Sequence, residues 1–179
     1  MTARQFAGLT IECVRGDITS QPDVDAVVCA ANAQLAPGGG VAGAIHRAAG
    51  PGLYEECKPL APIRTGEAVI TGGHGLPNTW CIHVLGPVYA QSVDPPGELA
   101  SCYREALARA EENHVTSIAT PAVSTGRFGY PVAEAADVAL RTVASGTSGH
   151  DSVKLVRFVL WDASDFDIHA RRLETLEAR

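Results

Sequence analysis

Hydrophobic positions change their spacing repeatedly along this chain, and the changes predict alternating strands and helices. Short apolar or alternating runs, bounded by glycine, proline or polar turns, predict strands over residues 9–14, 26–31, 67–71, 80–85, 115–120 and 153–160. Spacings of three and four residues predict helices over residues 41–49, 53–57, 95–110, 131–143 and 165–176, the last with Ser164 as its N-cap. The turn at residues 76–78 predicts that the strands on either side of it pair antiparallel. Strands that alternate with helices predict an α/β fold with a mostly parallel sheet.

Residues 25–52 combine an apolar strand, a glycine-rich loop and a helix in an order that suits an anion. The predicted strand runs into Asn32, the loop contains Gly38 to Gly40, and Gly50 closes the following helix. Such a loop lets its backbone approach a ligand closely, and the N-terminus of a helix attracts negative charge. An anion cradle is therefore favoured over a plain surface loop. The GxGxxG match at residues 38–43 is a weak dinucleotide signal, because no acid ends a strand about twenty residues later.

Unusual residues follow three of the predicted strands, at the ends where open α/β sheets bind ligands. Asn32 follows the second strand, residues 124–128 follow the fifth, and Trp161 and Asp162 follow the last. One crevice lined by all three segments is expected, with Asp17 bordering it.

Each of these segments has a structural and a functional interpretation. Asn32 is either a satisfied structural amide or a ligand contact, and the adjacent glycine loop favours the contact. Ser124 lacks a GxSxG motif and an assignable triad partner, so a second phosphate-binding turn is favoured over a nucleophilic serine. Phe128 and Trp161 belong to types that are usually buried, but their positions suit flat surfaces on which a ring could stack. His46 and His83 lie inside regular patterns and are expected to be structural.

Composition excludes several classes of protein. The 179 residues are expected to form one domain with a single core at about residues 9–176. The net charge of −6 and the absence of a Lys/Arg-rich run argue against a nucleic-acid partner, so local dipoles must hold any anion. No apolar run is long enough for a membrane helix and residues 1–10 lack a signal core, so a cytoplasmic protein without a membrane partner is expected. Oligomeric state stays open.

Cysteine and histidine spacing predicts neither disulfides nor a metal site. The five cysteines are odd in number and widely spaced, and no CxxC, HxxxH or Cys/His cluster is present. Reduced buried thiols are expected, with no metal and no cofactor.

Eight motifs in order resemble the macrodomain family, whose members bind ADP-ribose and its derivatives. The resemblance covers residues 9–176 and is closest to the branch of hydrolases that remove ADP-ribose from proteins or deacetylate O-acetyl-ADP-ribose. It implies a three-layer α/β/α fold with a central mixed, mostly parallel sheet. The motifs are GDIT at 16–19, DAVVCAAN at 25–32, GGGVAGAIHRAAG at 38–50, EC at 56–57, TGEAVITGG at 65–73, HVLGP at 83–87, SCYREAL at 101–107 and TPAVSTGRFGYP at 120–131.

The resemblance also implies a role for each segment of the crevice. Asp17 would accept a hydrogen bond from the adenine amino group beside the Ile18 backbone, and Trp161 would stack on adenine. Phe128 would lie over the distal ribose, and Asn32 would bind that ribose near its reactive carbon; both are candidate catalytic residues. Two backbone segments would hold the diphosphate, formed by Gly39, Gly40, Val41 and Ala42 and by Ser124, Thr125, Gly126, Arg127 and Phe128.

Two positions depart from the pattern of this branch. Cys29 replaces the first Asn of the usual NAAN, and a minor effect is expected because the position is predicted to be buried. Ala42 replaces an Asp that in this branch helps to activate a water at the ribose. Loss of a general base typically costs about 10²–10⁴-fold in rate.

The leading hypothesis is a hydrolase that cleaves ADP-ribose from mono-ADP-ribosylated proteins at an Asp/Glu ester, or from a related ester such as O-acetyl-ADP-ribose. The expected route is metal-independent and substrate-assisted. A non-catalytic ADP-ribose reader is the alternative that Ala42 favours, and a plain nucleotide or dinucleotide-binding protein is the third hypothesis.

Overall fold

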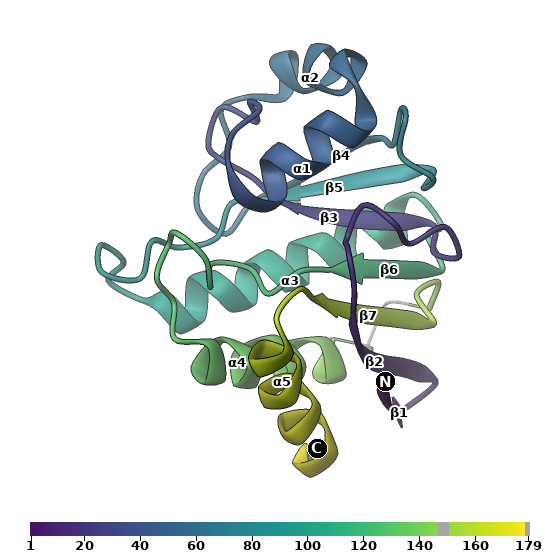
Figure 1. Cartoon of the computed structure of the whole chain (residues 1–179), viewed down its shortest axis with the longest axis vertical. Helices are drawn as coiled ribbons and strands as arrows, with labels where there is room; N and C mark the ends of the chain where they lie inside the picture. Colours follow the sequence, from purple (N-terminus) through teal and green to yellow (C-terminus); the bar gives the residue numbers. More distant parts are fainter. Residues whose placement is uncertain (147–150, 178–179) are drawn as a thin grey trace.

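A single seven-stranded sheet organises the computed structural model, which describes residues 1–146 and 151–177 (Figure 1). Across the sheet the strand order is β1-β2-β7-β6-β3-β5-β4. The strands are β1 (Thr2–Phe6), β2 (Leu9–Arg15), β3 (Ala26–Ala30), β4 (Ala68–Gly72), β5 (Trp80–Val84), β6 (Ser117–Thr120) and β7 (Leu155–Leu160).

The five inner strands run parallel and the two edge strands run antiparallel to their neighbours. This arrangement confirms the mixed, mostly parallel sheet and the antiparallel pairing of β4 with β5, in which Ile70 lies opposite Ile82. The carboxyl ends of β2, β7, β6, β3 and β5 therefore meet along one edge of the sheet.

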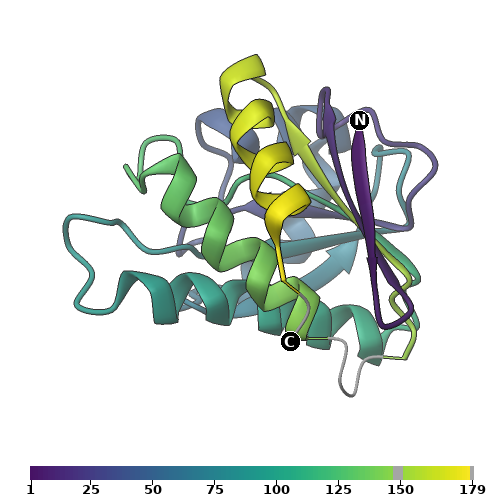
Figure 2. The same ribbon diagram turned by 90° about the horizontal axis from the view of Figure 1, so that it is seen from below.

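Helices cover both faces of the sheet and complete three layers (Figures 1 and 2). The helices α1 and α2 pack on one face, and α3, α4 and α5 pack on the other. Their bounds are α1 (Gly40–Ala49), α2 (Pro51–Cys57), α3 (Pro95–Glu112), α4 (Val132–Ser145) and α5 (Ala163–Thr175), with a 3-10 turn η1 (Lys58–Leu60) after α2.

The edge strand β1 was not predicted from the sequence, and its composition explains why. Only Phe6 of this strand is buried, so the pattern lacks an apolar face. Polar contacts hold it instead: the Arg4 guanidinium donates to the carbonyl oxygens of Leu173 at 2.9 Å and Glu174 at 3.1 Å, at the C-terminus of α5. Arginine is well suited to the free carbonyl groups of a helix end.

The predicted N-cap of α5 is wrong. Asp162 occupies the N-cap position with an extended backbone, and Ser164 lies inside the first turn. The helix begins earlier than predicted, and only Trp161 and Asp162 separate it from the end of β7 at Leu160. The other helix and strand predictions agree with the structure to within a few residues, and the predicted break at residues 145–151 lies partly outside the described residues.

All five cysteines are free and buried, as predicted. Burial raises the pKa of the Cys13, Cys29 and Cys102 thiols to about 12, which keeps them protonated at neutral pH. Cys29, the first departure from the family pattern, is fully buried in β3. Across residues 1–146 and 151–177, no helix has the length and apolar character needed to cross a membrane.

His83 on β5 is buried beneath α1 and α2 as a neutral imidazole. Its Nε2 lies 2.9 Å from the Thr71 hydroxyl and 3.8 Å from the Cys57 sulfur. Burial, and to a smaller extent nearby His46, lowers the pKa of His83 to about 4 against the opposing effect of Glu56. The unfolded chain therefore binds a proton between pH 6.5 and about 4 that the folded chain excludes.

We expect the free energy of unfolding to fall as the pH decreases from 6.5 to about 4, with His83 contributing up to about 3 kcal/mol. Replacing this histidine in His83→Gln keeps a group that can bond Thr71 but removes the titration. Urea unfolding at several pH values should give a shallower pH dependence for the variant. Some slope should persist, because burial also lowers the pKa of His46 and His169. Equal slopes in both proteins would contradict the assignment.

Candidate functional site

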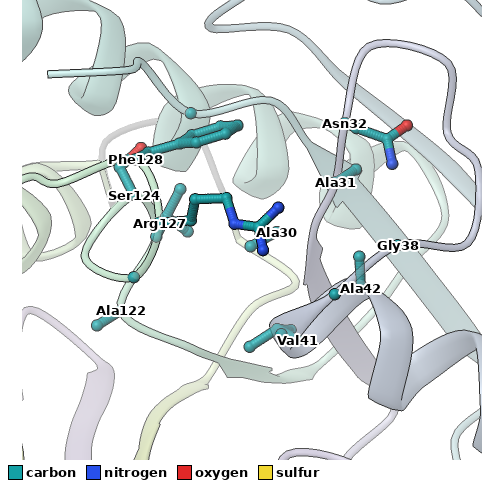
Figure 3. Close-up of a pocket in the computed structure, with 15 residues that line it drawn as sticks. Ala30, Ala31, Asn32, Gly38, Val41, Ala42, Ala122, Ser124, Arg127 and Phe128 are labelled. Carbon is teal, nitrogen blue, oxygen red and sulfur yellow. The ribbon is translucent and has the colours of Figure 1, made fainter. Parts of the chain in front are cut away.

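A pocket of about 320 Å³ opens at the edge of the sheet where the parallel strands end (Figure 3). Its walls come from the loops that follow β3, β5 and β6 and from the first turn of α1. This is the position at which open α/β sheets bind ligands. The lining residues are Ala30, Ala31, Asn32, Gly38, Gly39, Gly40, Val41, Ala42, Gly86, Ala122, Val123, Ser124, Gly126, Arg127 and Phe128.

The first turn of α1 forms one wall and leaves its backbone N–H groups without a cap. Gly39 is the N-cap and supplies no side-chain hydrogen bond, and the first turn holds no acidic residue. The first N–H groups of a helix have no intrahelical acceptor, and the helix dipole is positive there. Ala42, which is 5% exposed, is the third residue of this helix and places a methyl group where an acid would compensate that charge. The wall is therefore an open site for an anion.

Asn32 has a structural role as well as a place in the pocket. Its amide nitrogen donates to the Ala36 carbonyl at 2.8 Å, and its amide oxygen accepts from the Ala36 N–H at 3.0 Å. This pair of bonds closes the loop that leads to the glycines. An amide has two N–H donors and two lone pairs on its oxygen, so the bonds to Ala36 leave one of each unused. The two interpretations made from the sequence are thus compatible.

The loop after β6 forms the opposite wall and is held in a tight turn. Ser124 has a left-handed backbone, with φ of 68°, and its carbonyl accepts from the Tyr130 N–H at 2.9 Å. The Ser124 side chain is 6% exposed, and its hydroxyl oxygen has no hydrogen-bond partner among the described residues. This hydroxyl is buried where the Ser124 side chain packs against Gly86. The Phe128 ring lies in the same wall and extends toward the Asn32 side of the pocket (Figure 3).

Two glycines allow the walls to approach this closely. A Cβ on Gly43 would lie 2.1 Å from the Gly38 carbonyl oxygen, where the start of α1 packs against the preceding loop. A Cβ on Gly86 would lie 2.1 Å from the Ser124 hydroxyl oxygen. Gly86 was not among the predicted site residues, although its signal was present as the glycine that stops β5.

Charge in the pocket comes from one side chain. Arg127 is the only charged residue among those that line it, and no carboxylate does so. With the α1 N-terminus opposite, the lining is electropositive in a chain of net charge −6. The predicted preference for an anion thus has both a backbone and a side-chain basis.

Of the predicted site residues, Asp17, Ile18, Thr125 and Trp161 do not line this pocket. Asp17, Ile18 and Trp161 lie further along the same edge of the sheet. They follow the ends of β2 and β7, where Arg15 pairs with Leu160. Trp161 is 73% exposed and leaves a broad aromatic surface free. The Asp17 carboxylate accepts from the Thr19 N–H at 2.8 Å and the Thr19 hydroxyl at 2.7 Å through the same oxygen.

Residues 28–139 match the family model described as Macro domain. This chain belongs to the macrodomain family. The chain is 46% identical over 168 residues to the O-acetyl-ADP-ribose deacetylase of Salmonella typhimurium, covering 91% of this chain and 93% of that protein. It is 46% identical over 162 residues to the ADP-ribose glycohydrolase MACROD2 of Xenopus laevis, covering 89% of this chain and 38% of that protein.

Solved macrodomain structures share the fold over almost the whole chain. The Oceanobacillus iheyensis macrodomain with ADP superposes with a TM-score of 0.91 at 39% identity, covering 97% of this chain and 94% of that one. The three-layer macrodomain fold inferred from the motifs is thereby confirmed.

We expect Gly43→Ala to destabilise this macrodomain, although alanine ordinarily favours a helix by about 1 kcal/mol. The new methyl group meets the Gly38 carbonyl, which is backbone and cannot move aside, so a net loss of about 1–3 kcal/mol is expected. Gly39→Ala is the matched control, because a Cβ there has no heavy atom within 4 Å. Thermal unfolding should give a clearly lower midpoint temperature for Gly43→Ala than for Gly39→Ala. A Gly43→Ala protein as stable as the control would show that the close approach is not required.

Proposed function

We propose that this macrodomain binds ADP-ribose and hydrolyses it from mono-ADP-ribosylated proteins at an Asp/Glu-linked ester, or from a related ester such as O-acetyl-ADP-ribose. One observation carries the proposal: two backbone loops face each other across a pocket that contains an uncapped helix N-terminus and no carboxylate. A diphosphate needs these donors, and a carboxylate in the pocket would repel it. The names of the two relatives support a hydrolase that acts on ADP-ribose compounds.

In this proposal the ligand lies along the carboxyl edge of the sheet. Adenine occupies the β2 and β7 end, bonded to Asp17 and Ile18 and stacked on the exposed face of Trp161. The preorganised Asp17 carboxylate supports this placement, because Thr19 occupies only one of its oxygens. The diphosphate lies between the α1 N-terminus and the turn at residues 124–128, and the distal ribose lies between Phe128 and Asn32.

The proposed reaction adds water across the ester bond and yields a free carboxylic acid and ADP-ribose. None of the residues that line the pocket can accept the water's proton, because Ala42 stands where the macrodomain hydrolases that this chain resembles usually have an Asp. A phosphate oxygen of the substrate therefore orients and deprotonates the water. The remaining polar atoms of Asn32 position the ribose, and the N–H groups of α1 offset the negative charge.

A non-catalytic reader is the second candidate, and Ala42 is the observation that favours it. The pocket keeps every backbone donor for an anion but has no side chain that can act as a general base. Calorimetry that shows ADP-ribose binding, together with no hydrolysis at stoichiometric protein, would establish the reader. Tighter binding of NAD than of ADP-ribose in direct competition would instead favour a plain dinucleotide-binding protein.

We expect the protein to release label from an auto-ADP-ribosylated substrate, and to continue in the presence of EDTA. Asn32→Ala and Phe128→Ala should each slow release about tenfold or more, since each removes a group that positions the ribose. Thermal unfolding must accompany Asn32→Ala, because that change also removes the two bonds that close the loop at Ala36. Absence of release above a buffer control, at stoichiometric protein, would refute the hydrolase.

Restoring the acid should accelerate the proposed reaction. Ala42→Asp places a carboxylate in the first turn of α1, and recovery of a general base is worth about 10²-fold or more. Ala44→Asp is the control, since it adds the same charge to the same helix at a residue that does not line the pocket. Release rates at saturating substrate should rise for Ala42→Asp alone. An unchanged rate in a folded variant would mean that proton abstraction does not limit turnover.

A further inference from the structure

Arg127 is a cation in the pocket wall, and no partner for its charge is found among residues 1–146 and 151–177. Its side chain is exposed, and none of the hydrogen bonds or ion pairs among the described residues includes its guanidinium. Arg157 provides the contrast, because Glu12 and Asp23 hold it in two ion pairs on the sheet. Figure 3 shows the Arg127 guanidinium extending from its loop across the pocket, toward the wall that carries Gly38 and Ala42.

The backbone on either side of Arg127 is fixed while its side chain is free. The Gly129 N–H donates to the Gly126 carbonyl at 3.0 Å, and the Tyr89 N–H donates to the Phe128 carbonyl at 2.9 Å. These bonds set the point from which the side chain leaves the loop. A long cationic side chain that starts from a fixed point and lies over a pocket can close on a bound anion with little rearrangement of the chain.

Because no other charged side chain lines the pocket, the Arg127 guanidinium has a large effect on the attraction of an anion. The first turn of α1 holds no acid, so nothing in the opposite wall neutralises the guanidinium. The whole chain carries a net charge of −6, which opposes the approach of an anion at long range. A guanidinium presents a planar fork of donors that matches two phosphate oxygens at once.

We propose that the Arg127 side chain closes over the diphosphate of ADP-ribose and supplies the one contact from a charged side chain among the residues that line the pocket. The inference rests on the proposed function and extends it, because the backbone of this turn and the guanidinium act separately. The guanidinium contacts no atom of the ester bond that breaks, and a cation on the diphosphate lowers rather than raises the basicity of the phosphate oxygen that deprotonates the water. Arg127 is therefore a binding and positioning residue, and its loss should weaken substrate affinity more than turnover.

Calorimetry with ADP-ribose at low and high sodium chloride tests the proposal. Replacing the arginine in Arg127→Gln should weaken binding about tenfold at low salt, which is the usual scale for losing a charged hydrogen bond. The deficit should shrink at high salt, where the wild-type contact is screened. Arg127→Lys should retain the salt dependence with intermediate affinity, because it keeps the charge and loses the fork. Arg104→Gln, on the exposed side of α3, removes the same charge away from the pocket and should bind like wild type.

A second measurement separates the effect on substrate affinity from the effect on turnover. Single-turnover release at saturating protein should not fall more than about twofold below wild type for Arg127→Gln, while the protein concentration for half-saturation rises about tenfold. A binding deficit that is equal at both salt concentrations, or no deficit, would overturn the proposal. Loss of turnover at saturation with unchanged affinity would also overturn it. Failure of the wild-type protein to bind ADP-ribose would instead remove the proposed function on which the inference rests.

Discussion

Close packing against two glycines at the carboxyl edge of the sheet is the constraint on which the site depends. At Gly43 the first turns of α1 meet the carbonyl of Gly38, and at Gly86 the end of β5 meets the turn at Ser124. At both positions the neighbouring atoms leave no room for a Cβ. These two contacts bring the N–H groups of α1 and the loop after β6 to opposite sides of a pocket of about 320 Å³. Selectivity for an anion thus comes first from backbone geometry, which side-chain substitutions in the pocket cannot remove.

Much of this arrangement can be predicted from the sequence because the relevant signals are local. Periodicity located five helices and all the inner strands, since each element buries one apolar face or two. The glycines at residues 38–40 and the polar residue at the end of β3 indicated the anion site directly. Parallel strands must place their carboxyl ends together, so the loops after β3 and β6 were expected to share one crevice, and they do.

What could not be predicted depends on contacts that are distant in sequence. The edge strand β1 has no apolar face and is held by Arg4 at the far end of α5, 169 residues away at the Leu173 carbonyl. Gly86 was overlooked because its role is defined only by Ser124, which packs where a Cβ would be. The pair of hydrogen bonds between the Asn32 amide and the Ala36 backbone likewise could not be predicted without knowledge of the loop's path. Trp161 and Asp17 lie along the expected edge but outside the pocket, and their proposed contact with adenine rests on register with β7 and on the exposure of the ring.

The electrostatics of the two walls decide how binding and chemistry are divided. An acid in the first turn of α1 would serve as a base for water, but it would also lower the positive potential that attracts a diphosphate. It would face Arg127 across the pocket. The carboxylate would then attract the guanidinium, and this ion pair would compete with the contact between Arg127 and the phosphates of the ligand. With Ala42 in that position, no carboxylate in the lining opposes the helix dipole or the guanidinium of Arg127. In the proposed mechanism, the substrate's own phosphate replaces the missing acid in activating water. Tight retention of the diphosphate and slow, substrate-assisted hydrolysis are therefore two proposed consequences of one missing carboxylate.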